Sequence, residues 1–198
     1  GACFHSATWD HSVPLAGQRV GVIGTGSTAI QITSALASRV ARYDLFQRTA
    51  QWIMPIENQP YSEADKAEFA SNPDKLAALK VEVNGYFQLF SNAVIDAESA
   101  EMKQLEDACL ANLETQVLDP VLREQLRPNY RAGCKRLIFS SDFYTAIQQP
   151  NAHLITAGIE GVEPRGVRTS EGELRELDVL VIATGFRADS FIRPTTVL

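Results

Sequence analysis

GVIGTGSTAIQI, residues 21–32, runs from an apolar segment through two glycines into a helical pattern. This order predicts a buried strand, a tight turn and a helix whose free N–H groups face an anion. Gly24 permits the turn, Gly26 lets a pyrophosphate approach the backbone, and Ala29 lets the helix pack on the strand. The stretch therefore favours a dinucleotide site over a purely structural turn. The residues expected to contact the dinucleotide here are Gly24, Thr25, Gly26, Ser27, Thr28, Ala29 and Gln31.

The segments on either side of this turn predict a βαβ unit. Residues 19–23 form a short apolar strand, and the apolar positions from Ser27 to Val40 follow a helical repeat. A second strand is expected at 43–47.

The rest of the chain divides into a helical region and a β-rich region. Residues 62–128 begin with the capping-box pattern SEAD, are rich in helix-forming residues and predict inserted helices. Short strands are expected after them, at 153–156, 159–163, 166–169, 173–177 and 179–183. We therefore predict an α/β, Rossmann-like dinucleotide-binding domain with a largely parallel sheet, a β-meander and a helical insertion.

The end of the second predicted strand indicates which dinucleotide binds. An NAD site usually places Asp or Glu there, about 20 residues after the turn, to accept a hydrogen bond from the ribose 2′-hydroxyl. This sequence has Arg48 and Thr49 instead, which suit a phosphate, whereas Asp44 lies inside the strand. We therefore expect NADP, and the alternative for Arg48 is an ordinary surface arginine.

Composition argues against several other classes of protein. Among 198 residues there are 18 basic and 24 acidic side chains, and the net charge of −6 gives no support for a nucleic-acid partner. No apolar run approaches the roughly 20 residues of a membrane span, so we expect a cytoplasmic protein. Cys3, Cys109 and Cys134 are too scattered for a metal site, and we expect reduced thiols and no bound metal.

Four residues at the start of the sequence have the spacing of a known fingerprint. Gly1, His5, Trp9 and Asp10 match the second part of F-x-G-x-x-x-H-x-x-x-W-(P/D), so the segment resembles that of the Baeyer–Villiger monooxygenases. In that family the fingerprint lies in a linker between domains, which implies a role in domain motion and cofactor binding. A structural histidine is the alternative for His5.

Further segments resemble the same family in the same order. GTGSTAIQ resembles its NADP turn, FQRTAQWIMP its 2′-phosphate segment and CKRLIFSSDFY its Lys-Arg segment. DVLVIATGF resembles the strand that leads back to the flavin domain, which adds Ala183, Thr184 and Gly185 to the expected cofactor contacts. The resemblance covers nearly the whole chain and is weakest over 62–128.

The resemblance implies an FAD-dependent monooxygenase in which NADPH reduces the flavin, oxygen adds to it, and a ketone becomes an ester or lactone. It assigns Lys135 to the 2′-phosphate beside Arg48 and Thr49. It assigns Arg136 to the negative charge that develops during oxygen insertion, because a permanent cation can stabilise that charge. Leu137 stands where the family often has proline, and a solvated basic turn is the alternative for Arg136.

The resemblance also implies how the chain is divided. Residues 1–18 correspond to the interdomain linker, 19–185 to the NADP-binding domain with its helical insertion, and 186–198 to the return toward an FAD domain. The flavin's own glycine turn is not in this sequence, so we expect a fragment of a longer protein that is inactive alone. Two other functions stay open: an N- or S-oxygenating flavin monooxygenase, and a noncatalytic NADP-binding redox sensor.

Overall fold

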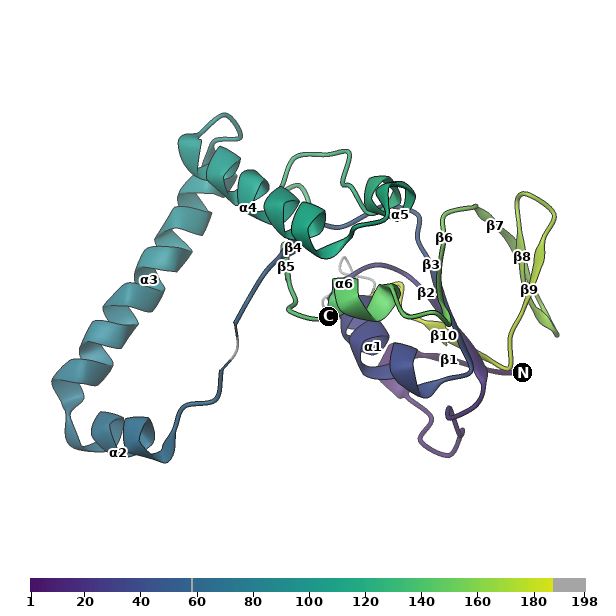
Figure 1. The fold of residues 1–198 in the computed structure, drawn as a ribbon, viewed down its shortest axis with the longest axis horizontal. Coiled ribbons are helices and arrows are strands. Elements are labelled where there is room, and N and C mark those ends of the chain that lie inside the picture. The colour runs from purple at the N-terminus through teal and green to yellow at the C-terminus, as the bar shows by residue number, and fades with distance from the viewer. Residues whose placement is uncertain (58, 187–198) are drawn as a thin grey trace, which may run out of the picture. The chain divides into compact units, whose positions relative to one another are not determined.

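The structure is a computed structural model that describes residues 1–57 and 59–186, and its chain divides into two compact units (Figure 1). Unit 1 comprises Gly1–Arg48 and Gln149–Leu198, and unit 2 comprises Thr49–Gln148. The last segment expected from the sequence, 186–198, lies outside the described residues except for Phe186.

Unit 1 is built on a five-stranded sheet in the order β1-β10-β2-β3-β6, in which every neighbouring pair is parallel. Its strands are β1 (Ala2–His5), β2 (Arg19–Ile23), β3 (Arg42–Phe46), β6 (Ala152–Ile155) and β10 (Val179–Ile182). Because β3 and β10 lie on opposite sides of β2, the carboxyl end of β2 is a point where the chain's connections diverge. Such points are where α/β sheets bind ligands.

Helix α1 (Ser27–Leu36) follows the glycine turn and continues as a 3-10 turn, η2 (Ala37–Arg39). Its buried residues are Ala29, Ile30, Thr33 and Leu36. The Thr33 hydroxyl lies 2.8 Å from the Tyr43 hydroxyl of β3, and both groups are buried. This pair joins the helix to the sheet through a satisfied polar contact.

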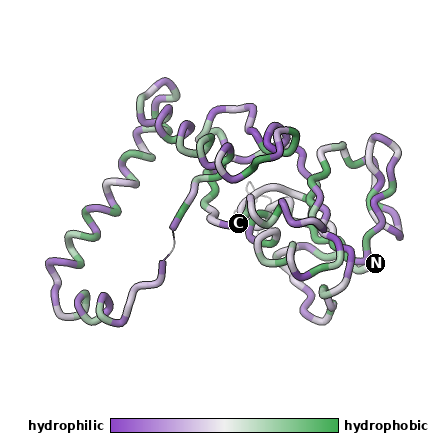
Figure 2. Tube along the Cα trace, viewed as in Figure 1, coloured by the Kyte–Doolittle hydropathy of each residue, from purple (hydrophilic) through white to green (hydrophobic). Residues whose placement is uncertain are grey.

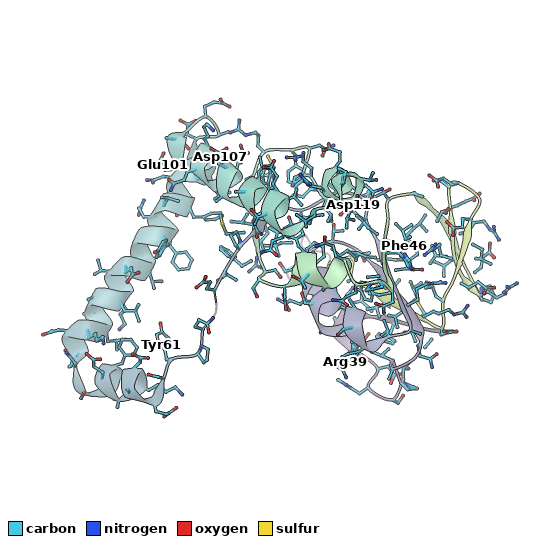
Figure 3. All side chains as sticks on the ribbon, viewed as in Figure 1. Arg39, Phe46, Tyr61, Glu101, Asp107 and Asp119 are labelled. Atoms are coloured by element: carbon cyan, nitrogen blue, oxygen red, sulfur yellow. The ribbon has the colours of Figure 1, made fainter. Side chains whose placement is uncertain are left out.

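An antiparallel sheet completes unit 1. It contains β7 (Ile159–Glu163), β8 (Gly166–Thr169) and β9 (Leu174–Glu176). Phe46, which Figure 3 labels, lies at the end of β3 and packs in a buried cluster with Val167, Leu177 and Leu180. The meander is thereby attached to the parallel sheet by apolar contact.

Unit 2 is mostly helical. Its elements are β4 (Ile53–Met54), α2 (Glu63–Ser71), α3 (Pro73–Ile95), α4 (Ala100–Gln116), α5 (Pro120–Gln125), β5 (Ile138–Phe139) and α6 (Phe143–Ile147). Strands β4 and β5 pair in parallel, and a buried cluster around Trp52 includes Met102, Leu105 and Cys109. Burial raises the pKa of the Cys109 thiol to about 12, and all three cysteines are free.

The ends of these helices follow the sequence signals. Ser62 caps α2 in a capping box with Asp65, Asn72 separates α2 from α3, and Pro73 is the first residue of α3. Along α3, polar and apolar residues alternate (Figure 2), and Tyr86 and Phe87 are exposed. No helix within residues 1–57 and 59–186 is long and apolar enough to cross a membrane.

The predicted fold class is confirmed, with a mostly parallel central sheet, an antiparallel meander and inserted helices. The strands predicted at 19–23, 159–163 and 166–169 have the observed bounds. Strand β1 was not predicted: residues 2–5, expected to be linker, pair with β10 at the sheet edge.

Asp178 connects the starts of β10 and β2. Its carboxylate accepts hydrogen bonds from the Arg19 backbone N–H at 2.9 Å, from Nε at 3.0 Å and from Nη2 at 2.7 Å. These bonds favour the ionised form and lower the pKa of Asp178 from 3.8 to about 2.

We expect Asp178→Asn to lower the free energy of unfolding at neutral pH by about 1 kcal/mol or less, because the pair is about a third exposed. A lowered pKa stabilises the folded state at pH values above the ordinary pKa of 3.8, and this stabilisation is lost as the pH falls through about 2. Urea titrations should therefore show the difference from the parent chain narrowing between about pH 4 and pH 2. Glu171→Gln, in the exposed β8–β9 turn, is the control, and a pH-independent difference would contradict the assignment.

Candidate functional site

The glycine turn lies at the carboxyl ends of three neighbouring strands. Gly24 has φ +123°, and its N–H donates to the carbonyl of Phe46 at 3.2 Å. A Cβ at this position would lie 2.4 Å from the Ala183 carbonyl oxygen, so a side chain has no room. The geometry of the turn therefore requires glycine at position 24.

Gly26 stands at the N-cap of α1 with φ −71°, and a Cβ there would meet no atom within 4 Å. The backbone at the start of the helix is therefore open to solvent, where its N–H groups and dipole attract an anion. Ala29 is completely buried, as its predicted packing role requires. The other residues predicted to contact the dinucleotide are half-buried or exposed: Thr25, Ser27, Thr28 and Gln31.

Two charged residues in and after β3 differ in exposure: Arg48 follows the strand and is exposed, whereas Asp44 lies within the strand and is buried. Arg48 is exposed and has no ion-pair partner among residues 1–57 and 59–186. Asp44 is fully buried, and its carboxylate accepts hydrogen bonds from Arg175 at 2.9 and 3.2 Å and lies 3.3 Å from Arg42. Asp44 is thus engaged inside the protein. Thr49, the other residue predicted here, is half-buried and belongs to unit 2.

The predicted ATG segment follows β10 beside the glycine turn. The Ala183 N–H donates to the Ile23 carbonyl at 2.9 Å, and Ala183 is buried. Thr184 and Gly185 are exposed, and Gly185 has φ +86°, which favours glycine. The structure therefore brings this segment and the turn to the same edge of the sheet.

His5 connects the fingerprint segment to the ATG segment. Its Nδ1 accepts a hydrogen bond from the Ala7 N–H at 3.1 Å, so Nε2 carries the proton. Nε2 then donates to the Gly185 carbonyl at 3.2 Å. The side chain is half-buried and has a structural connection that the sequence did not predict.

The other fingerprint residues are dispersed around β1. Trp9 packs edge-on against Phe4 with ring centroids 5.1 Å apart. The Asp10 carboxylate accepts hydrogen bonds from Ser12, which lower its pKa. A Cβ at Gly1 would lie 2.2 Å from the Asp178 carbonyl oxygen, so this position also needs glycine.

Lys135 and Arg136 lie in unit 2, on the exposed loop before β5. Lys135 Nζ lies 4.5 Å from the ring centroid of Tyr130. Arg136 has no ion-pair partner within the described part of the chain. Leu137 is buried in the Trp52 cluster, so the residue that replaces the family's proline anchors the loop through apolar contact.

Two residues that contact charged side chains discussed above could not be identified from the sequence. Arg175 neutralises Asp44 from the distant strand β9, and Tyr130 contacts Lys135 from within an irregular loop. Neither has a motif or a helical or strand periodicity that would have identified it.

Comparison with known proteins finds relatives in both sequence and structure, although no family model matches the chain. An uncharacterized monooxygenase of Mycobacterium tuberculosis is 43% identical over 194 residues, 98% of this chain and 39% of that protein. A Baeyer–Villiger monooxygenase of Pseudomonas aeruginosa is 36% identical over 191 residues, 96% of this chain and 36% of that protein. The crystal structure of cyclohexanone monooxygenase from Rhodococcus sp. Phi1 bound to NADP+ aligns with a TM-score of 0.75 and 29% identity, over 94% of this chain and 42% of that chain.

The chain therefore spans somewhat less than two fifths of the length of the curated relatives it matches, while almost all of its own length is aligned. The sequence similarity and the shared fold lead to the same assignment. These similarities fit a fragment of a class B flavin monooxygenase, a class in which relatives of this chain are named Baeyer–Villiger monooxygenase.

Proposed function

We propose that this chain is the NADPH-binding part of an FAD-dependent monooxygenase that inserts oxygen into ketones. The observation that carries the proposal is the open backbone at Gly26, at the N-terminus of α1 and the carboxyl end of β2. A pyrophosphate fits such a position because it needs close approach to the backbone and N–H donors. The intact protein would convert a small ketone and molecular oxygen into an ester or lactone.

The charges at the end of β3 favour NADP over NAD. Asp44 is paired with Arg175 and Arg42 and is not available to a ribose hydroxyl. Arg48 is exposed with an unpaired guanidinium among the described residues, so it can bind a 2′-phosphate through two parallel N–H groups. We assign Thr49 and Lys135 to the same phosphate.

The ATG segment and the fingerprint would hold the cofactor-binding edge of unit 1 in shape. His5 donates a hydrogen bond to the Gly185 carbonyl, and the Ala183 carbonyl lies close to Gly24. These contacts would fix the backbone around the turn. We expect Thr184 and Gly185 to contact cofactor from this edge.

Arg136 is assigned to the oxygenation step. When bound, FAD supplies the activation of molecular oxygen, for which protein side chains have no equivalent. Arg136 is exposed, and no carboxylate of the described residues neutralises its guanidinium. Its guanidinium can therefore stabilise negative charge that develops on the reacting oxygen atoms.

We expect Gly26→Ala to weaken binding of both NADP and NAD at least about tenfold, because the new methyl group occupies the space that the pyrophosphate needs. The fold should be retained, since alanine at an N-cap that holds glycine costs at most about 1 kcal/mol. Calorimetry measures the affinities and thermal unfolding measures the stability. Gly161→Ala, which also meets no atom within 4 Å, is the matched control; unchanged affinity in Gly26→Ala would remove the site.

We expect Arg48→Ala to weaken NADP binding by roughly one to two decades and to leave NAD binding nearly unchanged. A hydrogen bond to a charged group contributes about 1.5–3 kcal/mol, and only NADP carries the 2′-phosphate. Arg39→Ala is the control, because Arg39, labelled in Figure 3, is an exposed arginine beyond the far end of α1. Equal affinities of the parent chain for the two cofactors would refute the specificity.

We expect Arg136→Ala in the intact protein to abolish ester formation while some NADPH oxidation continues and yields hydrogen peroxide. Lys135→Ala should instead raise the apparent Michaelis constant for NADPH, with ester yield restored at saturating cofactor. Ester and peroxide are measured per NADPH consumed. Restored, coupled ester formation in Arg136→Ala would show that Arg136 only binds cofactor.

A further inference from the structure

Resting on the proposed function, we propose that Tyr130 is a positioning residue that holds Lys135 in the orientation that binds the 2′-phosphate of NADP. Lys135 Nζ lies over the Tyr130 ring, 4.5 Å from its centroid. The negative face of an aromatic ring attracts an ammonium group at this distance. A lysine side chain otherwise samples many rotamers, so the ring restricts where its charge lies.

Tyr130 itself is held in three ways. Its hydroxyl donates to Gln51 Oε1 at 3.0 Å, and its carbonyl oxygen accepts from Trp52 Nε1 at 2.8 Å. Its ring is half-buried and packs against the buried cluster around Trp52. The ring therefore cannot follow the motion of Lys135, and a fixed ring is what orienting a flexible side chain requires.

Two other cations of the same loop are held by carboxylates, whereas Lys135 is held by an aromatic ring. Arg127 is ion-paired with Glu114 and Glu124, and Arg131 is ion-paired with Glu98 and Glu106. Lys135 is exposed and makes no ion pair with the described residues. A carboxylate would hold the lysine and cancel its charge, whereas an aromatic ring holds it and leaves its N–H groups free to bind an anion.

The role of Tyr130 is therefore indirect and specific for the phosphate. Tyr130 acts through Lys135, so its ring should strengthen the binding of NADP, which carries the 2′-phosphate, and should not change the binding of NAD. A merely structural role would instead change the binding of NADP and NAD equally. The ratio of the two dissociation constants separates these possibilities.

The test measures the dissociation constants of NADP and NAD by calorimetry in the parent chain, Tyr130→Leu, Tyr130→Phe and Tyr86→Leu. Tyr130→Leu should raise the dissociation constant for NADP about two- to fivefold and leave that for NAD unchanged. Tyr130→Phe keeps the ring and should bind both cofactors as the parent does. Tyr86→Leu, at an exposed tyrosine of α3, is the matched control.

Combination with Lys135→Ala separates this inference from the proposed function. Lys135→Ala should weaken NADP alone, and adding Tyr130→Leu to it should have no further effect. If Lys135→Ala leaves NADP binding unchanged, the assignment of Lys135 to the phosphate is wrong. If Lys135→Ala weakens NADP but Tyr130→Leu does not, or if the two effects add, the role of Tyr130 is overturned.

A further variant tests the proposal in case Tyr130→Leu does not fold. Pentafluorophenylalanine at position 130 keeps the shape of the ring but reverses the charge of its face. It should weaken NADP binding at least as much as leucine does and again leave NAD binding unchanged. Parent-like NADP affinity in this variant would overturn the proposal.

Discussion

The close approach of Gly24 to the Ala183 carbonyl is the constraint on which the proposed cofactor-binding edge of unit 1 depends. With no side chain at position 24, the chain can turn out of β2 in close contact with the residue that follows the neighbouring strand β10. That turn sets where α1 begins, and so where its N–H groups point. The ATG segment is then held from the other side, because His5 donates to Gly185. The missing side chain at position 24 thus lets the end of β2, the start of α1 and the residues after β10 lie close together.

The charged residues of both units follow a common arrangement. Two carboxylates of the parallel sheet are paired with arginines, Asp44 with Arg175 and Asp178 with Arg19. Arg48, Lys135 and Arg136 are exposed and have no carboxylate partner among the described residues. A chain with a net charge of −6 therefore still exposes unpaired cations in each of its two units.

The sequence predicted those parts that depend on local order. β2, α1 and the capping box at Ser62 follow from apolar periodicity and from capping chemistry within a few residues. β1 could not be predicted from the sequence, because its four residues have no alternating pattern. Its strand partner is β10, which is far along the chain. The contact of Tyr130 with Lys135 was also beyond prediction, since it depends on how an irregular loop packs on the Trp52 cluster.

The burial of Asp44 has a consequence for protein engineering. Redesign toward NAD would normally look for a carboxylate near the second strand, and this chain has one only a few residues from the site. Arg175 and Arg42 hold it in the interior, and freeing it would take this carboxylate away from two part-buried arginines. A change of cofactor would therefore have to introduce a new acid at the strand end, beside or in place of Arg48, while leaving the old one undisturbed.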